Sequence, residues 1–151
     1  MASSLVKIDI HLIFHIKSTS VTMRHEDLPD IFSYMAGIIK GIGGASFTVG
    51  GTEDHIHILS SLPKNMSIAD FVRTIKSESS KWMKTIDASY ANFAWQDGYG
   101  AFSVSPSILD KTKAYIQEQK KHHERRTFRD EYCAFLVASG VSFDERHVFE
   151  D

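Results

Sequence analysis

Residues 53–60 read Glu-Asp-His-Ile-His-Ile-Leu-Ser, and histidine alternates with isoleucine at their centre. Side chains of a β-strand point to opposite faces in turn, so His55 and His57 are expected on one face and the two isoleucines on the other. The isoleucine face would anchor the strand in a core. The histidine face would place two imidazoles next to each other, either as ligands of one metal ion or simply as a polar strand face.

The sequence on either side of this strand predicts alternating strands and helices. The predicted elements are a strand over 8–17, a helix over 29–41, a strand over 46–49 that turns at Gly50-Gly51 into the histidine strand, a helix over 67–86, an extended segment over 93–105, and helices over 105–125 and 128–139. This order predicts an α+β, ferredoxin-like split βαβ fold. It would be an antiparallel sheet with helices on one face, plus a C-terminal helix that carries Tyr115.

Composition is typical of one globular domain that covers residues 1–151, with 42% hydrophobic and 24% charged residues. The lone Cys133 excludes an intrachain disulfide and an all-cysteine zinc site, and suits a reducing cytoplasm. No apolar run approaches the roughly 20 residues that span a membrane, and no secretory signal is visible. The net charge of −2 conceals a basic stretch over 111–129 followed by an acidic one over 130–151. A cytoplasmic protein is expected.

Tyr115 and Gln119 are four residues apart in a predicted helix, so their side chains would lie on one face, a turn from each other. A tyrosine hydroxyl can attack phosphorus, and an amide oxygen can complete a metal shell that two histidines begin. Ile108 and Thr112 share this stripe, which leaves a core position for Tyr115 as the alternative. His122 and His123 fall near the same face, where they would contact DNA, orient the tyrosine or act as ligands.

Several blocks in a fixed order carry a resemblance to a known family. They are residues 11–14, 54–59, 67–73, 75–76, 79–82 and 93–105, then Tyr115-Ile116, Gln119, His122-His123, Phe128 and 144–146. From about residue 8 to residue 149, the chain resembles the single-tyrosine HUH transposases of bacterial insertion sequences, of the insertion-sequence 200 and 605 type. The chain departs from the family after Lys17, where 18–20 read Ser-Thr-Ser in place of a basic stretch.

The resemblance implies cleavage and rejoining of single-stranded DNA that carries hairpins at the ends of a mobile element. His55 and His57 would be the HUH histidines, Gln119 the third ligand of Mg²⁺ or Mn²⁺, and Tyr115 the nucleophile that keeps the DNA 5′ end as a phosphotyrosine. Members of the family usually act as homodimers, and in many of them the tyrosine helix of one protomer completes the metal site of the other.

DNA binding needs less specific residues, namely cations that follow phosphates and aromatic rings that stack on bases. The candidates are Arg73, Lys76, Lys81, Lys84, Trp95, Lys120, Lys121, His122, His123, Arg125 and Arg126. Tyr99, beside a glycine turn, is a further stacking candidate. A solvated basic helix is the alternative for the cations, and core packing is the alternative for Trp95.

Two other functional classes remain open from the sequence. Histidine-triad nucleotide hydrolases also carry alternating histidines on a strand, but their run continues to a third histidine where this chain has Leu59. A catalytically inactive or domesticated relative would bind DNA hairpins without cleaving them.

Overall fold

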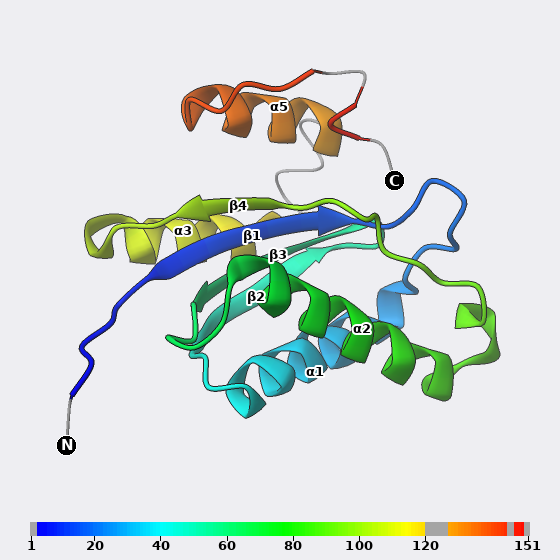
Figure 1. The fold of residues 1–151 in the computed structure, drawn as a ribbon. Helices are drawn as coiled ribbons and strands as arrows, with labels where there is room; N and C mark the ends of the chain where they lie inside the picture. The colour runs from blue at the N-terminus through cyan, green and yellow to red at the C-terminus, as the bar shows by residue number, and fades with distance from the viewer. Residues whose placement is uncertain (1–2, 120–126, 145–146, 150–151) are drawn as a thin grey trace.

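The structure is a computed structural model that describes residues 3–119, 127–144 and 147–149. Within these residues lies a four-stranded antiparallel sheet in the order β2-β3-β1-β4 (Figure 1). Its strands are β1 (Asp9–His15), β2 (Ser46–Thr52), β3 (His55–Ser61) and β4 (Gly100–Ser103). This order confirms the predicted split βαβ topology, because β3 lies between the two strands that α1 connects.

Helices cover both faces of this sheet (Figure 1). The helices α1 (Leu28–Gly41) and α2 (Ile68–Ile86) lie on one face, and α3 (Leu109–Gln117) and α5 (Phe128–Ala138) lie on the other. The predicted cap of α2 is confirmed, since Ser67 Oγ accepts a hydrogen bond of 3.1 Å from the Asp70 amide. Among the described helices, none is both long enough and apolar enough to cross a membrane.

The alternation of side chains in β1 and β3 builds two separate cores. Ile56 and Ile58 are fully buried under α1 and α2. On the opposite face, Leu59 packs with Ile116 of α3, and Ile13 packs with Tyr132 of α5. Burying both faces leaves the central strands shielded from solvent, so polar side chains on them sit in a nearly dry environment.

The predicted turn at Gly50-Gly51 is wrong. Strand β2 continues through both glycines to Thr52, and the turn is made by the next two residues, Glu53 and Asp54. Gly50 lies under α3, where a Cβ atom would stand 2.7 Å from the Ile116 carbonyl oxygen. Gly51 has a φ of +143°, which glycine adopts readily and other residues do not. These glycines therefore serve helix packing and local backbone geometry.

Two other predicted elements differ in extent. Only residues Gly100–Ser103 of the segment predicted as extended form a strand, although Trp95 makes an isolated bridge with Ile16 further back. The helix predicted over 105–125 begins as a short 3-10 turn at Pro106–Ile108 and continues as α3, whose last residue is Gln117. Residues 120–126 lie outside the described part of the chain.

Candidate metal and nucleophile site

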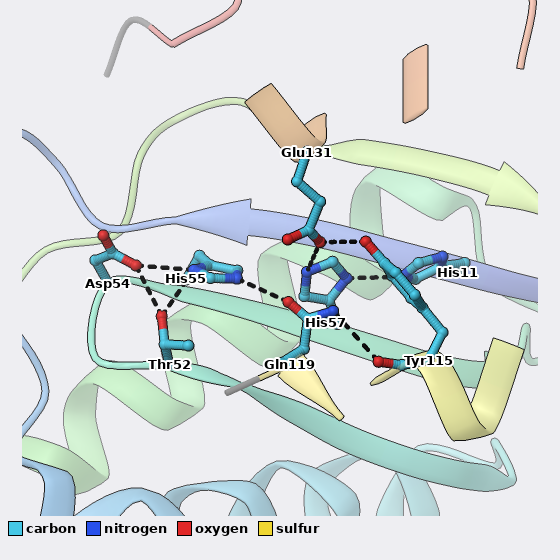
Figure 2. Close-up of polar contacts among 8 residues, drawn as sticks. All are labelled: His11, Thr52, Asp54, His55, His57, Tyr115, Gln119 and Glu131. Atoms are coloured by element: carbon cyan, nitrogen blue, oxygen red, sulfur yellow. Dashed lines mark hydrogen bonds and ion pairs between the residues drawn. The ribbon is translucent and has the colours of Figure 1, made fainter. Parts of the chain in front are cut away.

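The two histidines of β3 lie on the face that α3 and α5 cover (Figure 2). His55 is 0% and His57 1% exposed, and their ring centroids are 5.1 Å apart. The prediction that both project from one face is therefore confirmed. Their neighbours on this face are side chains from α3, α5 and β1, which are far away in the sequence.

His55 is held between a carboxylate and an amide. Its Nδ1 lies 2.8 Å from Asp54 Oδ1 and 3.0 Å from Thr52 Oγ1, and its Nε2 lies 3.2 Å from Gln119 Oε1. A carboxylate only accepts hydrogen bonds, so this contact favours the tautomer with hydrogen on Nδ1. The Nε2 lone pair of His55 then points at the amide oxygen of Gln119. Two acceptors face each other here, as they do around a bound cation.

His57 is held between a second imidazole and a carboxylate. Its Nδ1 lies 2.8 Å from His11 Nε2, and its Nε2 lies 3.4 Å from Glu131 Oε1. Burial, together with the charge of His57, lowers the pKa of His11 to about 3, although Glu131 opposes this shift. His11 is therefore a neutral imidazole at physiological pH.

Tyr115 places its hydroxyl in the same cluster from α3. The ring is half-buried and packs beside Leu59, and its centroid lies 6.0 Å from that of His57. The hydroxyl donates a hydrogen bond to Glu131 of α5. The two interpretations of Tyr115 are thus compatible, because its ring belongs to a core while its hydroxyl reaches the polar site.

Glu131 is 2% exposed and comes from a helix beyond the tyrosine helix. Burial raises the pKa of its carboxyl, but hydrogen bonds from His57 and Tyr115, with the nearby histidine charges, lower it to about 2. The carboxylate is therefore ionised. Sequence reasoning missed Glu131 and the contact of His11 with His57. Alternation in β1 could have placed His11 on the histidine face, whereas no local pattern marks Glu131.

The donor atoms present fit a divalent cation in part. Within the described residues no group of three His, Cys, Asp or Glu side chains stands close enough to hold a metal, so a third ligand would have to be the amide of Gln119. Adjacent ligands of an octahedral Mg²⁺, each at about 2.1 Å, are about 3 Å apart. The separation of 3.2 Å between His55 Nε2 and Gln119 Oε1 matches this spacing. Imidazole nitrogens favour Mn²⁺ over the harder Mg²⁺.

The predicted DNA-binding residues of α2 lie on the opposite side of the sheet from this site. Lys76 Nζ donates to the carbonyls of Gln96 and Gly98, each at 2.7 Å, and burial lowers its pKa to about 8, while nearby Asp97 raises it. Lys84 donates to the Phe93 carbonyl at 3.1 Å. These two lysines therefore hold the loop that follows α2, in addition to any contact with DNA.

The remaining DNA-binding candidates fall into three groups. Arg73 pairs with Asp70, and Lys81 lies 3.8 Å from Glu78, both in exposed positions. Trp95 is only 6% exposed and packs edge-on against Phe14, so the core alternative describes it and its ring faces are not open to bases. The third group lies outside the described residues: Lys120, Lys121, His122, His123, Arg125 and Arg126.

Gly50 provides a first test of how α3 positions Tyr115 and, just beyond its end, Gln119. A Gly50→Ala side chain would meet the α3 backbone at Ile116, so α3 must shift away from the sheet. We expect Mn²⁺ affinity, measured by calorimetry, to fall at least about tenfold. Gly37→Ala is the matched control, because no atom lies within 4 Å of its new Cβ. If Gly50→Ala binds Mn²⁺ as the parent does, the close approach of α3 does not position the site.

Comparisons with known proteins agree with the fold. Two solved structures share the fold with TM-scores of 0.60: a candidate transposase of Deinococcus radiodurans R1, and a REP-associated tyrosine transposase bound to a REP hairpin. The first is 20% identical to this chain, and the alignment covers 79% of this chain and 95% of the Deinococcus chain. The second is 11% identical to this chain, and the alignment covers 96% of this chain and 92% of the REP-associated chain. Among curated proteins, none matches the chain.

A family model provides the stronger evidence. The model described as IS200-like transposase matches residues 4–119, which include β1, His55, His57, Tyr115 and Gln119. The match ends before α5, so Glu131 lies beyond it. This family match rules out the alternative of a histidine-triad nucleotide hydrolase, which Leu59 already disfavoured. The chain belongs to the IS200-like transposase family.

Proposed function

We propose that this chain is a metal-dependent single-stranded DNA endonuclease and strand transferase that acts at hairpin-bearing element ends. The observation that carries the proposal is the contact between His55 Nε2 and Gln119 Oε1, backed by Asp54 and lying in one cluster with Tyr115. It joins two ligand atoms of suitable chemistry beside a potential nucleophile. The hairpin in the REP-associated neighbour supports hairpin DNA as the class of substrate.

In the proposed reaction, the hydroxyl oxygen of Tyr115 attacks the scissile phosphorus. The oxygen–phosphorus bond to Tyr115 forms as the bond from phosphorus to the 3′ oxygen breaks, which leaves a 5′-phosphotyrosine and a free 3′-OH. The hydroxyl proton that Tyr115 loses balances the proton that the leaving 3′ oxygen takes up. His55, His57 and Gln119 would hold Mg²⁺ or Mn²⁺, which when bound polarises the phosphate and stabilises its developing charge. The phosphotyrosine link conserves the bond energy, so a second 3′-OH can reverse the step and join strands without ATP.

The surface offers a route for DNA between the two sides of the sheet. A groove of about 530 Å³ beside α2 is lined by Lys17, Arg73 and Lys76, among others. Lys17 also lines a hollow of about 410 Å³ that extends to Phe128, the residue stacked on His55. We propose that the hairpin occupies the α2 groove and that the single strand passes Lys17 toward Tyr115.

We also propose that the protein acts as a homodimer, so that two element ends can be processed together. In this structure Tyr115 lies beside the histidines of its own chain. Each protomer of such a dimer would therefore carry a complete ligand set and nucleophile.

The test is cleavage of a labelled hairpin oligonucleotide taken from the DNA that flanks the gene. With Mn²⁺ we expect a covalent protein–DNA band that survives denaturing electrophoresis and disappears when EDTA is present. Hairpin binding without any covalent band would indicate the inactive or domesticated relative instead. Cleavage that EDTA leaves unchanged would contradict the metal requirement.

A further inference from the structure

A buried imidazole behind one of the proposed metal ligands has no role in the function described so far. We propose that His11 is a positioning residue that holds the His57 ring and accepts the Nδ1 hydrogen of His57 when Nε2 of His57 binds a metal ion. This inference rests on the proposed function, because it concerns the same site. Its structural basis is the contact of 2.8 Å between His11 Nε2 and His57 Nδ1 (Figure 2). Both residues are only 1% exposed.

The two nitrogens of an imidazole ring have different tasks at a metal site. If His57 binds a metal through Nε2, its Nδ1 carries hydrogen and needs an acceptor. His11 Nε2 lies in the right place because Ile13 pairs with His57 across β1 and β3, which makes His11 a diagonal neighbour on the same face. Asp54 performs the equivalent task for His55.

This arrangement has an energetic cost at Nδ1, the second nitrogen of the His11 ring. When Nε2 of His57 binds a metal ion and its Nδ1 donates to His11 Nε2, His11 must carry hydrogen on its own Nδ1, and that atom has no hydrogen-bond partner among the described residues. Phe135 lies edge-on to the ring at 5.0 Å. A buried donor without an acceptor is unfavourable for folding, so packing alone does not account for a histidine here.

The test compares His11→Phe and His11→Gln in the full chain. Phenylalanine preserves the ring but removes the acceptor, whereas the glutamine Oε1 can take the place of Nε2. We expect His11→Phe to weaken Mn²⁺ binding, measured by calorimetry on metal-free protein, about 10–100-fold. We expect His11→Gln to stay within about threefold of the parent, as a rescue that a purely structural role would not produce. Thermal melting in EDTA checks that both variants fold.

Each outcome separates this inference from the proposed function. Parent-like Mn²⁺ affinity in His11→Phe, or equal weakening in both variants, would overturn the role of His11. A parent protein that binds no Mn²⁺ overturns the inference together with the metal requirement. If the parent and variants bind Mn²⁺ as expected but the parent forms no covalent DNA adduct, the proposed activity fails and the role of His11 stands.

Discussion

Replacing Tyr115 with phenylalanine is expected to abolish the covalent protein–DNA adduct and to lower cleavage at least about 1,000-fold, because the attacking oxygen is lost. The phenylalanine ring can keep the contacts that the tyrosine ring makes beside Leu59, so α3 should stay docked. Hairpin binding in a gel-shift assay should remain parent-like, since the α2 groove lies on the other side of the sheet. Denaturing electrophoresis after incubation with Mn²⁺ measures the adduct.

Tyr34→Phe is the matched control, because Tyr34 is half-buried and stacks on Trp82 on the opposite face of the sheet. It should form the adduct at the parent rate. An adduct that persists in Tyr115→Phe would mean that another tyrosine attacks. Tyr132 is a poor substitute, because burial raises its pKa to about 12 and deprotonation at pH 7 would cost about 7 kcal/mol.

Replacing His57 with alanine is expected to abolish cleavage while leaving hairpin binding in place. The variant removes a proposed metal ligand and leaves His11 and the ionised Glu131 without the imidazole between them. Mn²⁺ affinity should fall at least about 100-fold, more than the loss expected for a residue behind the ligand. Calorimetry with Mn²⁺ and a gel-shift assay with the hairpin, performed on the same preparation, separate the two properties.

His25→Ala controls for the loss of a histidine, because His25 is exposed and its imidazole pairs with Glu53. Its Mn²⁺ affinity and cleavage should equal those of the parent. Equal loss of hairpin binding and cleavage in His57→Ala would indicate a folding defect or a role in DNA binding, and would contradict the assignment of His57 to the metal.

Predictions from local periodicity succeeded where one element decides the outcome. The period of two in β3 placed His55 and His57 on one face and Ile56 in the core, because strand geometry alone sets that alternation. The spacing of Tyr115 and Gln119 likewise predicted that both reach one site from the same segment, and Gln119 Nε2 lies 3.4 Å from the Tyr115 carbonyl oxygen. The turn predicted at Gly50-Gly51 was wrong, because glycine is typical both of turns and of positions where a helix packs closely on a strand.

The sequence by itself determined the order of the sheet, the shared face of the histidines and the candidate nucleophile, since periodicity and motif order depend on neighbouring residues. Tertiary structure alone decided that His11 contacts His57, that Glu131 of α5 meets Tyr115, and that Trp95 is buried. Those contacts join residues from separate elements, and burial decides which polar groups must satisfy one another. No local pattern carries that information, because it arises only when α3 and α5 pack on the same face of the sheet.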